Sequence, residues 1–240
     1  MLHVSTPELS IVLPCYNESA GLAEILRRFE ALGGEIEFEL ILVDNGSRDD
    51  TQAVLQNLLP SHPFARSVHV PENLGYGHGI SQGLKAARGA ILAWSHADLQ
   101  TDPVDVFRAA ELLRSSAAPE RTIVKGYRHG RALGDRIISR GMQVVALLLL
   151  RRWIPEINAQ PKVFSRELMP FIPHPPDDFN FDIYVLYRAL RNGWTIRKID
   201  VEFPPRRFGV SHWAATWKSK CRTILRSKWF MLRLGLGLWQ

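Results

Sequence analysis

The stretch "LSIVLPCYNESAGLAEILRRFEAL", residues 9–32, contains an apolar run, a polar loop and an amphipathic segment, in that order. The run "LSIVLP" (9–14) predicts a buried strand, because it is short and rich in β-branched and aliphatic side chains. After the loop, apolar side chains recur between Leu22 and Phe29 at the spacing of one helix face. The stretch therefore predicts one strand–loop–helix unit.

The same unit recurs along the first half of the chain. The further predicted strands are 38–44, 67–71, 90–95 and 122–127, and the helices between and after them are 48–59, 80–89 (with Gly89 as its C-cap) and 102–116. Strands that alternate with helices are typical of a parallel sheet covered by helices. We therefore expect an α/β fold with a Rossmann-like, mostly parallel sheet flanked by helices.

The second half has a different pattern. It predicts a helix over 134–153, a loop to 161, a helix over 181–193 and a strand over 195–205. The tail, 213–240, alternates Lys and Arg with Trp, Leu and Phe, which is typical of an amphipathic helix at a membrane interface. Two other interpretations stay open, a helix whose tryptophans cover the domain and a nucleic-acid-binding segment. We expect no nucleic acid, because the chain has no nucleic-acid motif.

Bulk composition limits the classes of protein. At 240 residues and 46% hydrophobic composition, the chain can bury a full core. A formal net charge of +6 favours an anionic partner. Cys15 and Cys221 do not make a disulfide framework, which indicates a reducing compartment. The longest apolar run, 144–150, is too short to span a bilayer, and the first ten residues do not resemble a signal peptide.

Polar clusters follow four of the predicted strands. They are "PCYNES", "DNGSRDD", "ENLGYGHG" and "SHADLQ". In an open parallel sheet, ligands bind outside the carboxyl ends of the strands. The clusters therefore predict one binding site at one edge of the sheet.

These clusters, in this order and spacing, resemble the inverting family 2 glycosyltransferases, and in particular the branch of the dolichol- and polyprenyl-phosphate sugar synthases. The resemblance covers roughly 9–212. It implies a GT-A fold over 1–212, with a nucleotide-sugar-binding half (1–105) and an acceptor half (106–212). It also implies a nucleotide-diphosphate-sugar donor and a divalent metal, Mn²⁺ or Mg²⁺.

The resemblance also implies which residues bind the donor. The set consists of Pro14, Tyr16, Asn17, Glu18, Asp44, Gly75, Lys85, Ala97 and Asp98. Asp44 would contact the base or ribose, and Gly75 and Gly77 would let the backbone approach the nucleotide. For Lys85, a solvated charge on a helix is an equal alternative.

The metal motif of the family is Asp-Ala-Asp-Leu-Gln, and here it reads His96-Ala97-Asp98-Leu99-Gln100. A metal there stabilises negative charge on the departing diphosphate. We expect His96, Asp98 and Gln100 to bind the metal, with a preference for Mn²⁺, because imidazole suits transition metals. Binding would weaken as His96 becomes protonated. The alternative is that His96 bonds a phosphate directly and no metal is needed.

Basic residues predict an anionic acceptor. The acceptor-phosphate set consists of Arg128, Arg136, Arg206, Arg207, Ser211 and His212, with Arg140 on the same helix face as Arg136. The catalytic set consists of Asp98, Asp182, Arg128 and Arg207. Singly, each arginine would be interpreted as a solvated charge.

Two types of acceptor stay open. A lipid phosphate already carries an anionic oxygen, whereas a glycan hydroxyl needs a carboxylate base. Asp182 is the first candidate base, and Asp177 and Asp178 are the second choices. The alternative for Asp182 is a charge that stabilises a helix N-terminus. The changed metal motif, together with Tyr184 where the family has Glu, leaves a third possibility, a catalytically silent nucleotide-sugar-binding partner. We expect a cytoplasmic protein, peripheral at the cytosolic face of a membrane.

Overall fold

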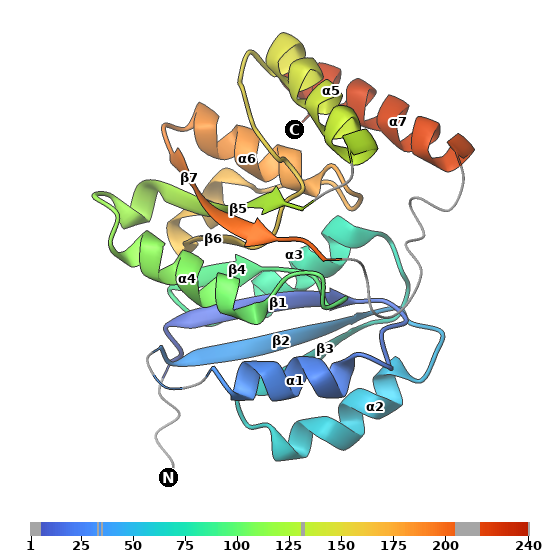
Figure 1. The fold of residues 1–240 in the computed structure, drawn as a ribbon, viewed down its shortest axis with the longest axis vertical. Helices are drawn as coiled ribbons and strands as arrows, with labels where there is room; N and C mark the ends of the chain where they lie inside the picture. The colour runs from blue at the N-terminus through green and yellow to red at the C-terminus, as the bar shows by residue number, and fades with distance from the viewer. Residues whose placement is uncertain (1–5, 33, 35, 131–132, 205–216, 240) are drawn as a thin grey trace.

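The computed structural model describes residues 6–32, 34, 36–130, 133–204 and 217–239. Within them, one sheet has the strand order β3-β2-β1-β4-β6-β5-β7 (Figure 1). The strands are β1 Leu9–Cys15, β2 Phe38–Asn45, β3 Ala65–Val70, β4 Ile91–Trp94, β5 Thr122–His129, β6 Lys162–Ser165 and β7 Thr195–Glu202. β6 pairs antiparallel with β4 and β5, and the other pairings are parallel. The expected mostly parallel α/β sheet is confirmed.

Helices cover both faces of this sheet. They are α1 Leu22–Glu30, α2 Thr51–Leu58, α3 Tyr76–Ala86, α4 Pro103–Arg114, α5 Leu133–Leu150, α6 Phe181–Arg191 and α7 Trp217–Gly235. Short 3₁₀ turns occur at η1 Leu59–Ser61, η2 Pro119–Arg121 and η3 Arg166–Phe171. The apolar residues of α1, α2 and α4 join one core cluster, and those of α3 and α6 join the other.

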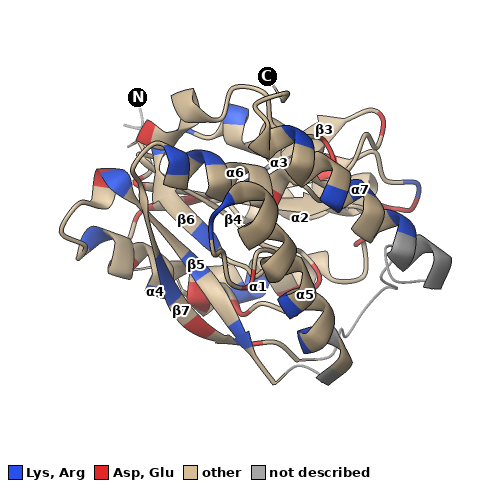
Figure 2. Cartoon of the chain, turned by 90° about the horizontal axis from the view of Figure 1, so that it is seen from above, with Lys and Arg blue, Asp and Glu red and all other residues tan. Residues whose placement is uncertain are grey.

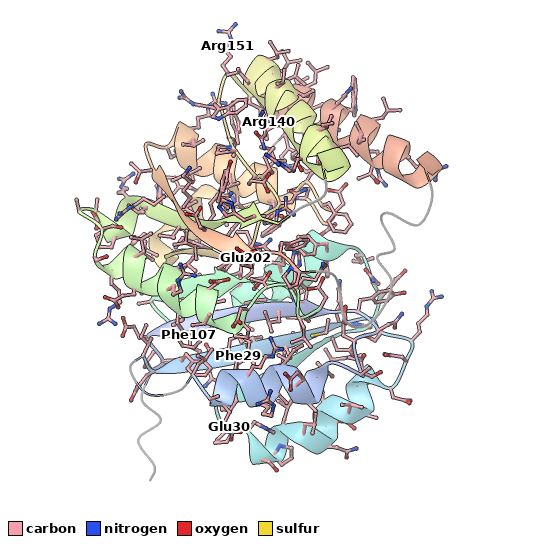
Figure 3. All side chains as sticks on the ribbon, in the orientation of Figure 1. Phe29, Glu30, Phe107, Arg140, Arg151 and Glu202 are labelled. Atoms are coloured by element: carbon pink, nitrogen blue, oxygen red, sulfur yellow. The ribbon has the colours of Figure 1, made fainter. Side chains whose placement is uncertain are left out.

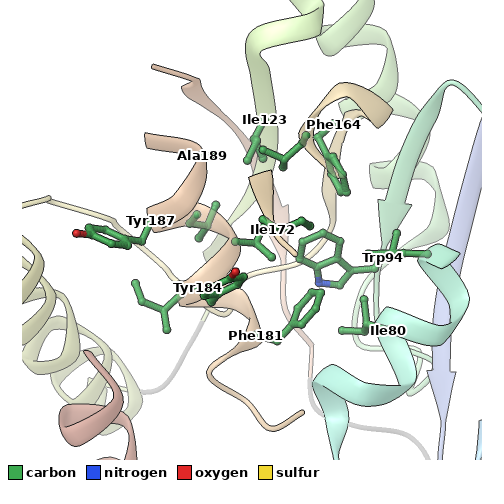
Figure 4. Close-up of a cluster of buried hydrophobic side chains, with 14 of the residues drawn as sticks. Ile80, Trp94, Ile123, Phe164, Ile172, Phe181, Tyr184, Tyr187 and Ala189 are labelled. Atoms are coloured by element: carbon green, nitrogen blue, oxygen red, sulfur yellow. The ribbon is translucent and has the colours of Figure 1, made fainter. Parts of the chain in front are cut away.

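The sheet separates the two core clusters, because alternate side chains of each strand point to opposite faces. Along β1, Val12 packs toward α3 and Leu13 packs toward α1, because successive side chains point to opposite faces of a sheet. The α3–α6 core centres on Trp94, whose ring meets Phe164 and Phe181 edge to face (Figure 4). Burying one such aromatic side chain stabilises the fold by roughly 1.5–3 kcal/mol.

α5 and α7 pack against each other beyond the sheet (Figure 1). The predicted helical tail is present from Trp217, and residues 213–216 lie outside the described part. α7 buries Phe230, Met231 and Leu234, while Leu225 and Trp229 are exposed. Among the described residues, no helix has the length and apolarity needed to cross a bilayer.

The structure differs from the sequence prediction at two elements. β6 begins directly after the predicted loop, which ends at residue 161, and the sequence analysis does not predict it as a strand. α3 begins at Tyr76 and ends at Ala86, so it starts four residues earlier than predicted, and Gly89 is not its C-cap. Gly89 instead lies against the backbone of Ser10, where a Cβ would come within 2.8 Å of the amide nitrogen. The division of the chain near residue 105 stays a prediction.

Candidate active site

The predicted polar loops lie at one edge of the sheet. Cys15 is the register partner of Asp44 at the ends of β1 and β2, and Asp44 is the partner of His69 on β3. Burial raises the pKa of the Cys15 thiol well above its usual range, and the charges of Glu18 and Asp44 add to this effect. The carbonyl oxygens of Glu18 and Ala97 both approach the position of a Cβ on Gly21, at 3.7 and 3.8 Å. The loops after β1, β2 and β4 therefore meet.

The loops after β1 and β2 interlock through side-chain contacts. The Asn17 backbone N–H donates to Ser47 Oγ at 3.1 Å, and Asn17 Oδ1 accepts from the Arg48 N–H at 2.8 Å. Asn17 adopts φ +57°, which asparagine tolerates better than most residues. Asp44 is buried, and its two oxygens contact the Ser47 N–H and His69 Nδ1, each at 3.1 Å. Asn17 and Asp44 thus fix the shape of the predicted base and ribose pocket, beside Pro14 and Tyr16.

The acidic loop after β4 is held in a strained turn. Asp98 is buried, and its Oδ1 accepts the Gln100 backbone N–H at 3.1 Å. Leu99 between them has φ +60°, an unfavourable region for a branched side chain. Gln100 Nε2 donates to the carbonyl oxygen of Pro204 at 2.9 Å, which ties the loop to the end of β7. Such strain is common where a turn presents functional groups.

His96 lies among both charges and rings. Its ring centroid is 5.8 Å from that of Tyr76. Burial lowers its pKa, Asp98 and Asp182 oppose this shift, and the cations Lys162 and Arg128 add to it. The imidazole is therefore neutral near pH 7.

A buried ion pair that the sequence analysis missed lies beneath His96. Lys162 Nζ is 2.7 Å from Asp182 Oδ1, and both side chains are almost fully buried. Trp94 Nε1 donates to the same carboxylate oxygen at 3.2 Å. The side-chain amide of Gln160 lies 2.9 Å from the Tyr76 hydroxyl. The signal for Lys162 in the sequence is its position directly before the apolar pair "VF".

Two more basic side chains, Arg128 and Lys125, lie near Lys162. Arg128 Nε contacts Glu156 Oε2 at 2.8 Å, and its guanidinium carbon lies 5.2 Å from the centre of the Phe203 ring. Lys125 is the register partner of Lys162 and is equally buried. Its Nζ donates to the carbonyl oxygens of Gly126 at 2.9 Å and Pro155 at 3.0 Å. Burial lowers the pKa of Lys125 well below its usual range.

Two glycines of "NLGYGHG" lie against the loop before α6, and their approach to a nucleotide stays a prediction. A Cβ on Gly75 would overlap the carbonyl oxygen of Asp177, and a Cβ on Gly77 would overlap that of Pro176. These glycines let the first turn of α3 contact the loop before α6. The His78 backbone N–H donates to the Asp177 carbonyl oxygen at 3.0 Å across this contact.

Several predicted residues lie elsewhere. Lys85 is exposed in the last turn of α3, roughly 14 Å along the helix from Tyr76. This exposure favours the solvated-charge interpretation, and a role of Lys85 in donor binding stays a prediction. Arg136 and Arg140 are exposed on α5, and Figure 3 shows Arg140 and Arg151 on the α5 side of the molecule. The remaining acceptor residues, Arg206, Arg207, Ser211 and His212, lie outside the described part of the chain.

The described residues can supply part of a metal site. They contain no cluster of three His, Cys, Asp or Glu side chains suited to a metal ion. His96 and Asp98 offer two ligands close together, while the amide nitrogen of Gln100 is bound to Pro204. Mg²⁺ in nucleotide sites is typically held by one or two carboxylates together with substrate phosphates. The set therefore fits a metal that shares its coordination with a diphosphate.

Comparison with known sequences identifies the family of this chain. The family described as Glycosyl transferase family 2 matches residues 10–169, two thirds of the chain. The chain belongs to glycosyl transferase family 2. This family 2 chain is 26% identical over 214 residues to glycosyltransferase AglD of Haloferax volcanii, a match that covers 83% of this chain and 33% of AglD.

A second relative is the undecaprenyl-phosphate 4-deoxy-4-formamido-L-arabinose transferase of Pseudomonas syringae. It is 38% identical over 108 residues, 43% of this family 2 chain and 32% of the transferase. The chain thus spans about a third of the length of the curated relatives that it matches.

Solved structures support the fold. Glucosyl-3-phosphoglycerate synthase of Mycobacterium tuberculosis, in complex with Mn²⁺, UDP and glucosyl-3-phosphoglycerate, superposes with a TM-score of 0.71. It is 21% identical and aligns with 96% of this family 2 chain and 80% of the synthase. The same synthase with Mg²⁺ and UDP gives a TM-score of 0.70. The GT-A fold is therefore confirmed.

Proposed function

We propose that this chain is an inverting glycosyltransferase domain that moves one sugar from a nucleotide-diphosphate donor to a polyprenyl-phosphate-type acceptor. The names of the curated relatives support the type of reaction, and that of the Pseudomonas transferase supports the acceptor class. The solved synthase binds UDP and a divalent metal, which supports the donor class.

The observation that carries the choice of acceptor is the state of the candidate bases. Asp182 is buried against Lys162 and the Trp94 indole. Asp178 accepts two hydrogen bonds from the side chain of Asn180. Asp177 contacts His78 Nδ1 at 3.0 Å. This arrangement favours an acceptor that needs no carboxylate base.

A phosphate monoester meets that requirement. Its second pKa is about 6, so one of its oxygens is a ready nucleophile near neutral pH. This oxygen attacks the anomeric carbon, and the bond from that carbon to the β-phosphate oxygen breaks. The nucleoside diphosphate leaves with the electron pair, and the configuration at the anomeric carbon inverts.

The residues of the chain divide the remaining tasks. The interlocked loops after β1 and β2 hold the base and ribose. Arg128 lies on the acceptor side, at the same edge of the sheet, and orients the incoming phosphate. A Mn²⁺ or Mg²⁺ ion held by His96 and Asp98 would supply positive charge to the departing diphosphate. Asp98 is therefore the residue on which transfer depends most.

The surface of α5 and α7 supports a membrane-bound acceptor. Its exposed apolar residues, here called the α5–α7 face, are Ile137, Val144, Leu147, Leu148, Trp153, Leu225, Trp229, Leu236 and Leu238. Neither 136–152 nor 217–240 contains an acidic residue, and Figure 2 shows Lys and Arg along both helices. Exposed apolar groups beside cations suit the surface of an anionic bilayer. We place this surface at the cytosolic face of a membrane.

A transfer assay tests the proposal. The protein is incubated with labelled UDP-glucose, UDP-N-acetylglucosamine or GDP-mannose, with Mn²⁺ or Mg²⁺, and with undecaprenyl phosphate, dolichyl phosphate or methyl glycosides. We expect label in the lipid phosphate, and Asp98→Ala should lower the rate by about 100-fold or more.

Asp102→Ala is the matched control. Asp102 lies four residues further along the same loop, and its carboxylate caps α4 by accepting the Val104 N–H. Its loss should cost about 1 kcal/mol of stability and leave transfer intact. Transfer only to the glycosides would show that the acceptor is a hydroxyl. No transfer from any donor would leave a silent binding partner.

A further inference from the structure

The loop before α6 carries an exposed aromatic ring, that of Phe179, close to the strand-end loops of the candidate site. Phe179 stacks on Tyr76 with ring centroids 5.1 Å apart and planes 17° apart, and Tyr76 in turn meets His96. Phe179 is 43% exposed, although Phe181, two residues later, is fully buried. Tyr76 is held from behind by the Gln160 amide. The three rings form a row from the acidic loop to the surface, in which Phe179 is stacked on Tyr76 and His96 is tilted against it.

Close backbone packing holds Phe179 in this position. The loop can approach α3 because positions 75 and 77 are glycine. The His78–Asp177 contact at 3.0 Å and the hydrogen bonds from Asn180 to Asp178 fix the loop on both sides of Phe179. The ring is therefore presented by a rigid support.

The residues that flank Phe179 in the chain carry oxygen acceptors. Asp177 presents a carboxylate with a side chain that is 61% exposed. Asn180 Oδ1 is buried and meets no hydrogen-bond donor among the described residues. A buried polar atom of this kind is normally satisfied by a bound group or a water. An exposed apolar ring in a loop that also carries these two oxygen acceptors suits a molecule with a C–H face and peripheral hydroxyl groups.

We propose that Phe179, with Asp177 and Asn180 at its edge, forms a subsite for the pyranose ring of the donor sugar. This inference rests on the proposed function, because it places the transferred sugar next to the diphosphate site at His96 and Asp98. The nucleobase has its own place in the loops after β1 and β2. The sugar is attached at the opposite end of the diphosphate, so it extends toward this row of rings.

Saturation-transfer NMR on the full chain tests the subsite without a nucleotide. The probes are the methyl α-glycosides of glucose, mannose and galactose at millimolar concentration. We expect transfer to the ring C–H protons of at least one glycoside. Transfer should disappear in Phe179→Ala and persist in Phe179→Tyr, which keeps the aromatic face. The control is Val104→Ala, an exposed apolar residue on α4, at the opposite face of the sheet; it should match the wild type.

Calorimetry then assigns the sugar to the donor. UDP-glucose is compared with UDP, and GDP-mannose with GDP. Phe179→Ala should weaken the binding of the sugar nucleotide by about 3- to 10-fold, as expected for the loss of one stacked ring. The affinity for the matching nucleotide should stay unchanged. Equal weakening of both would show a structural effect and overturn the proposal.

The two proposals fail in different ways. Saturation transfer that is absent from the wild type, or unchanged in Phe179→Ala, overturns the subsite even if the protein transfers sugar. Phe179-dependent binding of a glycoside, without binding of any nucleotide sugar, retains a sugar site and overturns the glycosyltransferase proposal.

Discussion

At the residue scale, the Lys162–Asp182 pair joins the center of the sheet to α6. An ion pair this deeply buried is costly to break, because removal of one partner leaves an uncompensated charge. We expect Lys162→Met to lower the free energy of unfolding by about 3–5 kcal/mol. The double variant Lys162→Met/Asp182→Leu should recover most of that loss. A urea-unfolding double-mutant cycle measures both values.

The contrary result is equally clear. A Lys162→Met protein within about 1 kcal/mol of the wild type would mean that the pair is open in solution, since partners in contact normally couple by more than this. Asp182 would then be available as a base, and the argument for a phosphate acceptor would lose its main support.

Lys125 differs from Lys162 because its Nζ is held by two carbonyl oxygens. The charged groups that act on it are Lys162, Glu156, Arg128 and Asp182. Burial holds its pKa in the folded protein below the value of about 10.4 in the unfolded chain. Between these two values the unfolded chain binds more protons, so stability rises as the pH increases.

Lys125→Met should remove this contribution. We expect the free energy of unfolding of the wild type to increase relative to that of the variant as the pH is raised from 7 to 10. Denaturant unfolding at each pH measures it. Parallel curves for the two proteins would show that Lys125 is charged and stably bound in the folded state throughout this range.

At the element scale, the first turn of α3 and the loop before α6 depend on each other. Gly77→Ala would place a methyl group on the Pro176 carbonyl oxygen, and we expect a loss of about 1–3 kcal/mol. Gly141→Ala is the matched control, because Gly141 is also inside a helix but has no atom within 4 Å of its Cβ position.

The control should become more stable by about 0.5–1 kcal/mol, since alanine favours a helix. Thermal and urea unfolding of the two variants give the comparison. Gains of similar size in both would show that the α3–loop contact is open in solution.

The correctly predicted strands and helices have a clear period of apolar side chains, and helices alternate with strands along the sequence. Long apolar runs such as 38–44 identify a strand without any knowledge of its neighbours. β6 has four residues and begins with a buried lysine, so its apolar pattern is too short to identify a strand. Its stability comes from pairing with β4 and β5, which is a tertiary effect. The predicted α3 is shorter because Gly75 at its N-cap and Gly77 and Gly79 in its first turn oppose helix formation in isolation.

The site residues stay predictions, but the sheet explains why the sequence places some of them at one edge. Asp44 ends β2 and Asp98 follows β4, and both strands run parallel to β1, so both residues come at the carboxyl edge of the sheet. Lys162 and Glu156 could not be predicted, because their partners Asp182 and Arg128 are distant in sequence and depend on the packing of α6 and β5.

At the scale of the whole molecule, the α5–α7 face should control membrane binding. Sedimentation with vesicles of anionic or neutral lipid measures it. We expect binding to anionic vesicles that weakens with salt, because the cations contribute by an electrostatic attraction that ions screen. Leu148→Ser/Trp229→Ser should reduce binding, because these side chains are 72% and 63% exposed.

Leu74→Ser is the control for this experiment, as an exposed apolar residue outside the α5–α7 face. Its binding should equal that of the wild type. If all three proteins bind equally, the exposed apolar groups of α5 and α7 do not meet lipid, and the acceptor must reach the rim in another way.

The position of β6 has a consequence for synthesis of the chain. β4 is completed at Trp94, but the strand that pairs with its second edge begins only at Lys162. Until that segment leaves the ribosome, a row of main-chain amides on an apolar strand stays open to other chains. Nascent chains that contain β4 but not yet β6 are therefore vulnerable to mispairing, and a chaperone would be most useful to them at that stage.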